Sequence, residues 1–137
     1  MKKIVSVMLS LILLLSSFCI PIYASVPEIS PYYLHIRSMG RSFTINSQTG
    51  EARVLADLTI SSGDHCSVSA SVQKKVNTTW RSFAVLRDSG TEDAGFIEYV
   101  ALDSGYTYKC VFTFIVYDVN GNIIEQKSFT SEEIYYG

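Results

Sequence analysis

Few residues of this 137-residue chain are of a type that could do chemistry, and their spacing speaks against most of it. The two histidines, His35 and His65, have no cysteine or carboxylate at the spacing of a structural zinc site, which needs about four ligands. No Gly-x-Ser-x-Gly elbow accompanies the many serines. We therefore expect ordinary surface histidines, no metal and no cofactor. A Ser-His-Asp site assembled in space from distant residues stays open as an alternative.

Acidic residues gather in two segments. Residues 118–125 (DVNGNIIE) have Gly at position four and Glu at position eight, whereas a calcium-binding EF-hand needs them at six and twelve. A hairpin turn is the better interpretation of this segment. The second segment has the residue types of a glycosidase pair, but we expect a solvated loop and strand edge. Its acidic residues are Asp88, Glu92, Asp93 and Glu98.

Aromatic residues are the one suggestive feature, with one Trp, nine Tyr and seven Phe in the chain. We predict that Trp80 and Tyr117 project to solvent near one end of the same sheet. There the rings would stack on a sugar or a peptide, without any titrating group. The alternative is that both rings serve core packing and cross-strand pairing.

Strands must position these side chains, because apolar and polar residues alternate with period two through most of the chain. No stretch of ten or more residues shows helical periodicity. The pair Asn120-Gly121 predicts the clearest hairpin, with a type I′ turn. We predict an all-β fold, a seven-stranded antiparallel Greek-key sandwich. The strands are expected at residues 34–46, 51–60, 66–76, 79–87, 95–101, 105–118 and 122–134.

The start of the chain has the three parts of a secretory signal peptide. Two lysines precede an apolar run over residues 4–22, and the small residue Ala24 offers a cleavage site. We therefore expect a signal peptide at residues 1–24 and a secreted, extracellular protein. An extended leader at residues 25–33 and one β-sandwich domain at residues 34–137 would follow.

Charge excludes two classes of partner. Without the signal peptide the chain has nine basic and thirteen acidic side chains, dispersed along the sequence. This balance lacks the basic surface of a nucleic-acid-binding protein. It also lacks the polybasic patch that holds a protein on an anionic membrane. We expect no nucleic-acid partner, no membrane partner after cleavage, and a monomer.

Two cysteines, Cys66 and Cys110, remain after cleavage at Ala24. An exported protein meets an oxidising environment, where an even pair is consistent with one disulfide. The alternative is two buried thiols that pack as small hydrophobic residues.

A resemblance to two sandwich families narrows the fold. Residues 102–111 (LDSGYTYKCV) resemble the tyrosine corner of fibronectin type III domains, which implies a buried Tyr108 whose hydroxyl bonds to the backbone. The order of Cys66, Trp80 and Cys110 is similar to the immunoglobulin pattern, which implies that the two cysteines face each other between sheets. In the fibronectin-like order Cys110 is too distant from Cys66 to bridge. The strand count favours the fibronectin-like order.

The whole chain also resembles a loose group of small exported proteins of Gram-positive anaerobes. The shared features are a Pro-Tyr leader at residues 31–33, a Trp80 hairpin, and the segments 104–108 (SGYTY) and 117–122 (YDVNGN). This resemblance implies export and the sandwich fold, and it supplies no activity.

Taken together, these patterns predict a secreted, non-enzymatic β-sandwich module that binds an extracellular glycan or protein. Two alternatives stay open. One is a secreted hydrolase with a spatially assembled site, and the other is a small antagonistic toxin or inhibitor.

Overall fold

The structure is a computed structural model that describes residues 33–137. The expected signal peptide and all of the expected leader before Tyr33 lie outside the described residues. No helix in the described part of the chain is long and apolar enough to cross a membrane.

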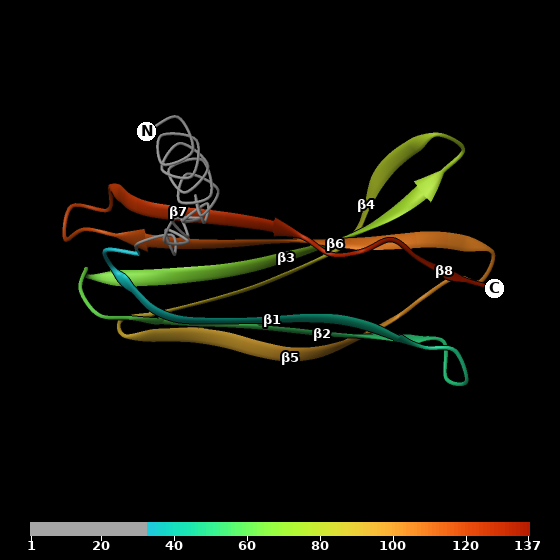
Figure 1. The fold of residues 1–137 in the computed structure, drawn as a ribbon, viewed down its shortest axis with the longest axis horizontal. Coiled ribbons are helices and arrows are strands. Elements are labelled where there is room, and N and C mark those ends of the chain that lie inside the picture. Colours follow the sequence, from blue (N-terminus) through green and yellow to red (C-terminus); the bar gives the residue numbers. More distant parts are fainter. Residues whose placement is uncertain (1–32) are drawn as a thin grey trace, which may run out of the picture. The chain divides into compact units, whose positions relative to one another are not determined.

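Eight antiparallel strands form two packed sheets, as Figure 1 shows, so the predicted all-β sandwich is confirmed. One sheet has the order β1-β2-β5. The other has the order β4-β3-β6-β7, and β8 also pairs with β6. The strands are β1 (Ile36–Asn46), β2 (Glu51–Ile60), β3 (His65–Val76), β4 (Thr79–Gly90), β5 (Asp93–Ala101), β6 (Tyr106–Tyr117), β7 (Ile123–Thr130) and β8 (Ile134–Tyr136).

The place of β4 distinguishes the two expected strand orders. In immunoglobulin constant domains the fourth strand joins the sheet of the first two. Here β4 pairs with β3 in the opposite sheet, which is the fibronectin-like alternative. The immunoglobulin-like placement of the cysteines is therefore wrong.

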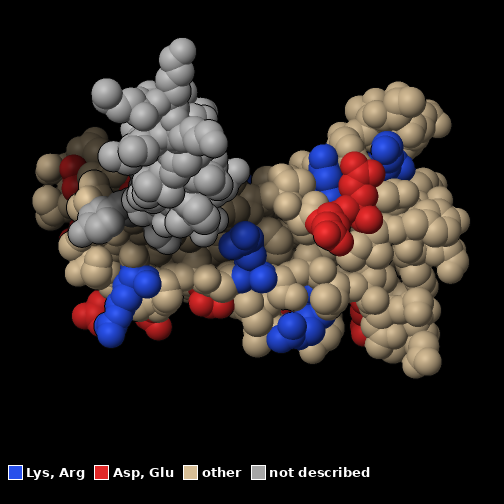
Figure 2. Space-filling view, viewed as in Figure 1, with Lys and Arg blue, Asp and Glu red and all other residues tan. Residues whose placement is uncertain are grey.

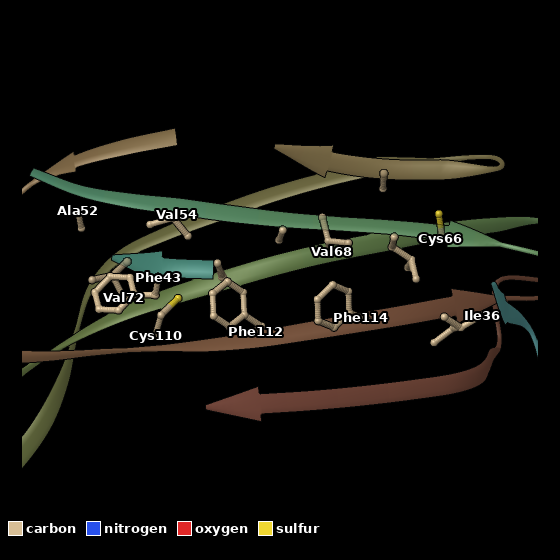
Figure 3. Packing of buried hydrophobic residues seen from close by; sticks show 14 of the residues in the cluster. Ile36, Phe43, Ala52, Val54, Cys66, Val68, Val72, Cys110, Phe112 and Phe114 are labelled. Carbon is tan, nitrogen blue, oxygen red and sulfur yellow. The ribbon is translucent and has the colours of Figure 1, made fainter. Parts of the chain in front are cut away.

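The disulfide expected between Cys66 and Cys110 is also wrong. On the paired strands β3 and β6, Cys66 lies opposite Val116, whereas Cys110 lies opposite Val72. The two cysteines are thus six residues apart along β3, about 20 Å, while a disulfide needs Cα atoms within about 7 Å. Both are buried free thiols at opposite ends of the core close-up in Figure 3. Burial raises the pKa of the Cys110 thiol to about 12.

Alternation builds the core, because the buried inward residues of each central strand are apolar. The rings of Phe112 and Phe114 lie between the sheets (Figure 3). Burying a side chain of this size stabilises the fold by roughly 1.5–3 kcal/mol. The buried set is Ile36, Phe43, Ala52, Val54, Ala56, Leu58, Cys66, Val68, Ala70, Val72, Ala94, Tyr108, Cys110, Phe112, Phe114 and Val116.

The tyrosine corner is confirmed. The Tyr108 side chain is 0% exposed. Its hydroxyl donates to the carbonyl oxygen of Asp103 at 2.8 Å and accepts from the backbone N–H of Asp103 at 3.0 Å. The hydroxyl thus satisfies both backbone groups of one crossover residue, and this fixes the start of β6 against the core.

The end of the chain differs from prediction, because the expected strand 122–134 is two strands. Ser131 interrupts it: its N–H donates to the Cys110 carbonyl at 2.8 Å, and its hydroxyl accepts from the Cys110 N–H at 2.9 Å. A side-chain oxygen replaces a backbone carbonyl in the ladder, so the regular pairing of β7 ends. β8 then pairs with the first residues of β6.

The hairpin between β6 and β7 forms as predicted, but its turn is not type I′. That turn needs positive φ at both central residues, and here Gly121 has φ 79° while Asn120 does not lie in the positive region. The Asp118 carboxylate explains the difference, because it accepts from the backbone N–H of Asn120 at 2.9 Å and of Asn122 at 2.8 Å. Hydrogen bonds to the Asp118 carboxylate, chiefly those from the side chain and backbone of Asn122, lower the pKa of Asp118.

Candidate functional site

The candidate site is the surface of the sheet β4-β3-β6-β7 that points away from the core, here named the outer face. Even-numbered residues of β3 and β6 are buried over most of their length, so the odd-numbered ones point outward. Their cross-strand partners on β4 and β7 share this face. The outer face consists of His65, Ser67, Ser69, Ser71, Gln73, Lys75, Trp80, Ser82, Val85, Arg87, Ser89, Thr107, Lys109, Val111, Thr113, Ile115, Tyr117, Ile123, Gln126, Ser128 and Thr130.

The composition of the outer face is unusual for an acidic domain. It has nine hydroxyl groups of Ser and Thr and three lysine or arginine side chains, Lys75, Arg87 and Lys109. None of its residues is acidic. On the side of the molecule visible in Figure 2, by contrast, basic and acidic side chains are interspersed. The outer face is thus a hydroxyl-rich, weakly basic surface.

Tyr117 forms one end of the outer face. Its ring stacks on that of His65 with 4.5 Å between centroids and 8° between planes. Its hydroxyl lies 3.3 Å from Ser67 Oγ, which holds the ring against β3. An open depression of about 520 Å³ lies beside this ring. Its lining residues are Ser67, Val68, Ser69, Arg87, Asp88, Ser89, Ile115 and Tyr117.

Trp80 forms the other end, directly opposite Lys75 on β3. Its half-buried ring has two ammonium groups over it, with Lys109 Nζ at 4.2 Å and Lys75 Nζ at 5.3 Å from the ring centroid. Lys75 Nζ also lies 3.5 Å from a carboxylate oxygen of Glu133. The Trp80 ring therefore packs against two ammonium groups and is not an unoccupied stacking surface.

Trp80 and Tyr117 share the outer face but do not lie near one end of it, so that expectation is wrong. Trp80 follows the last residues of β3, whereas Tyr117 lies opposite His65 at the start of β3. Because β3 and β6 are antiparallel, the end of one strand lies beside the start of the other. The two rings therefore lie at opposite ends of the sheet.

The two histidines lie at the Tyr117 end of the sandwich, but their partners do not assemble a catalytic relay. His35 Nδ1 is 2.8 Å from Ser62 Oγ, and this contact is exposed. Of the nearby acids, Glu125 accepts from the backbone N–H of His35 at 2.8 Å, and Asp64 contacts His65, with 3.2 Å between Oδ2 and Nδ1. A Ser-His-Asp site needs the serine and the orienting carboxylate on the same imidazole ring, whereas here the Ser62 hydroxyl contacts one ring and the Asp64 carboxylate contacts the other.

Two of the acidic candidates, Asp88 and Asp118, bind backbone groups. Asp88 accepts from the N–H of Gly95 at 2.8 Å, and Asp118 holds the β6–β7 turn as described above. Among residues 33–137, no three His, Cys, Asp or Glu side chains gather where they could hold a metal ion.

Comparison of this chain with protein-family models and with curated proteins finds no match. The outer face is therefore interpreted from its own geometry. Sequence reasoning missed the roles of Lys109 and Arg87 on it. Alternation with the inward row already places Lys109 outward, but only the register of β3, β4 and β6 brings it beside Trp80.

Proposed function

We propose that this chain is a secreted, non-enzymatic binding module that holds an extracellular glycan on the outer face. The observation that carries the proposal is the depression beside Tyr117, where an aromatic ring, serine hydroxyls and the Arg87 guanidinium converge. Ligand sites combine apolar surface with a few placed polar groups in this way. The volume of about 520 Å³ is within the usual range for small ligands.

The pairing of the strands favours a glycan over a peptide. Extended peptides bind to sheets by adding a strand to a free edge. At the Tyr117 end the central strands β3 and β6 are paired on both sides, and the free edges of this sheet are those of β4 and β7 at its margins. The surface instead presents hydroxyls and a ring, which hydrogen-bond to sugar hydroxyls and contact the apolar face of a pyranose.

One contact favours the alternative function, a secreted hydrolase: the exposed hydrogen bond between His35 and Ser62. The missing acid on that imidazole ring supports binding over hydrolysis. We therefore interpret the His35–Ser62 contact as one that joins the residue before β1 to the loop before β3. The backbone hydrogen bond from Ser61 to the His35 carbonyl, 2.8 Å, joins the same two segments.

A glycan array probed with the exported protein tests the proposal. We expect Tyr117→Ala to lower binding by on the order of tenfold or more, because it removes the ring that lines the depression. Tyr99→Ala is the matched control, since Tyr99 is an exposed tyrosine on β5 of the other sheet. Equal binding by wild type and Tyr117→Ala, or loss with Tyr99→Ala alone, would end the proposal.

Export is tested separately. The protein recovered from culture supernatant should begin at Ser25, which follows the cleavage site at Ala24. A stable membrane-bound species that begins at Met1 would contradict secretion.

A further inference from the structure

We infer that the Trp80 end of the outer face is an anion subsite that recognises the carboxylate of an acidic polysaccharide. The inference rests on the proposed function, that the outer face binds a glycan, and it names the class of glycan. Three side chains form the subsite: Trp80 of β4, Lys75 of β3 and Lys109 of β6.

The Lys109 ammonium carries an uncompensated charge. It lies 4.2 Å from the centroid of the Trp80 ring, a distance at which a cation is attracted by the ring quadrupole. The four ion pairs within the described residues do not include it. The ring orients this ammonium without cancelling its net charge, because an indole is neutral. An incoming anion thus meets a cation that is already positioned.

Lys75 is the second and partly compensated cation of the subsite. Its ammonium lies 3.5 Å from Glu133, whose side chain is 52% exposed. Such an exposed pair is weak and easily exchanged for another anion. A ligand carboxylate between Lys75 and Lys109 would replace Glu133 as the partner of Lys75.

The surrounding charge directs an anion to this face. Acidic side chains outnumber basic ones by four after removal of the signal peptide, so most of the domain repels an anionic polymer. The outer face is the exception, with Lys75, Arg87 and Lys109 and no acidic residue in its register. An anionic ligand therefore gains the most binding free energy beside the Lys109 ammonium, which none of the ion pairs among the described residues neutralises.

The spacing of the two ends favours a polymer. Lys75, opposite Trp80, and His65, opposite Tyr117, are ten residues apart along β3, about 33 Å in an extended strand. A chain of several sugar units can contact both ends at once. Serine hydroxyls of β3 lie between them, and β3 itself has no free backbone edge for a peptide.

Trp80 provides the readout, because it is the only tryptophan in the chain. The exported protein is titrated with oligogalacturonate and with its neutral methyl ester while the tryptophan emission is recorded. We expect the free acid to bind at least tenfold more tightly than the ester, and we expect salt to reduce this preference. Hyaluronan oligosaccharides and their methyl esters form a second acid–ester pair.

Matched variants assign the effect to Lys109. Lys109→Gln should abolish the preference for the free acid, and Lys109→Arg should keep it. Glu133→Gln should strengthen acid binding by a few-fold, because it releases Lys75. Lys127→Gln is the control, since Lys127 also lies over an aromatic ring, 5.1 Å from the centroid of Tyr33, but outside the outer face. Unchanged unfolding midpoints confirm that these variants fold.

The outcomes separate the inference from the proposed function. Equal affinity for acid and ester in both pairs, or an acid preference that survives Lys109→Gln, overturns the anion subsite. If Tyr117-dependent glycan binding persists in that case, the proposed function stands without it. Equally tight, Lys109-dependent binding of oligoglutamate would also overturn the inference, because the subsite would then recognise an acidic peptide. Loss of all glycan binding overturns both.

Discussion

Two lysine–aromatic clusters lie side by side where β3 pairs with β6, and they point to opposite sides of the sheet. Lys74 is directed inward, with its ammonium 4.4 Å from the Tyr106 ring and 5.0 Å from the Phe83 ring. Lys109 is directed outward, over Trp80. The inward lysine also bonds to the carboxylate of Asp103 at 2.9 Å, and no carboxylate within the described residues pairs with the outward one.

The difference shows how the same contact serves two purposes. The Lys74 cluster is closed, because its charge is balanced by Asp103, whose backbone also holds the Tyr108 hydroxyl. The Lys109 cluster is open, because none of the ion pairs among the described residues neutralises the Lys109 charge over the ring. We expect changes in the closed cluster to affect stability, and changes in the open cluster to affect binding alone.

The largest loss of stability should come from removing the Tyr108 hydroxyl, which bonds to the backbone of Asp103 in the closed cluster. Tyr108→Phe removes a donor and an acceptor from the buried corner and leaves both backbone groups of Asp103 without their partner. We expect a loss of about 2 kcal/mol in the free energy of unfolding, measured with urea. Tyr106→Phe is the control, because that ring keeps its contact with Lys74. If both variants lose the same stability, Tyr108 does not form the corner.

Cys110 follows Lys109 in the sequence and points into the core. This thiol should make the free energy of unfolding depend on pH in the alkaline range. Burial raises the pKa of Cys110 to about 12 from its ordinary value of 9.0, so the folded thiol keeps its proton when the unfolded thiol loses it. Stability is therefore complete below pH 9 and falls between pH 9 and 12, by up to about 1.4 kcal/mol per pH unit. Burial also raises the pKa values of Cys66 and Tyr108, which adds to the loss in the same direction.

Unfolding midpoints measured from pH 8 to 11 test this dependence. Cys110→Val keeps the buried apolar volume and removes the thiol, so its stability should fall less steeply above pH 9. Identical slopes for wild type and Cys110→Val would show that Cys110 is not the group responsible.

A smaller effect is expected at Lys74 itself. Lys74→Gln removes the charge that faces Asp103 and should lower the unfolding midpoint less than Tyr108→Phe does. The double variant with Asp103→Asn should be more stable than the sum of the single losses predicts, because both changes break one contact. Strict additivity would show that the two charges do not interact.

The smallest effect should come from the open cluster. Lys109→Gln should change the free energy of unfolding by less than about 0.5 kcal/mol, because this half-buried lysine has no ion-pair partner among the described residues. Thermal unfolding of the variant beside wild type measures it. A loss as large as that of Tyr108→Phe would remove the contrast between the clusters and make Lys109 a structural residue.

Most of the fold follows from local patterns. Period-two alternation predicted the strands because one face of every central strand packs on the core, and the predicted bounds of β2 are the observed ones. The tyrosine corner was readable because its bonds lie within residues 102–111. The break at Ser131 was not readable, since it depends on hydrogen bonds to Cys110 on another strand.

The candidate site was less predictable, because it depends on register. Sequence placed Trp80 and Tyr117 on one face correctly, but their separation depends on which residues of β3 oppose them. The same holds for Lys109, whose ring partner is far away along the chain. A pattern along one strand shows the direction of a side chain and not its neighbours on the next strand.

The long-range pairing of β3 with β6 has a consequence for how the chain reaches this state. Sandwiches built from such distant partners fold in milliseconds to seconds, since long loops must close before the contacts form. During that time both thiols are accessible, and the unfolded chain can join Cys66 to Cys110, which the finished sheet holds about 20 Å apart. Oxidation before folding would lock the two strands out of register. Folding itself, once complete, protects each thiol by burying it on a different part of the core.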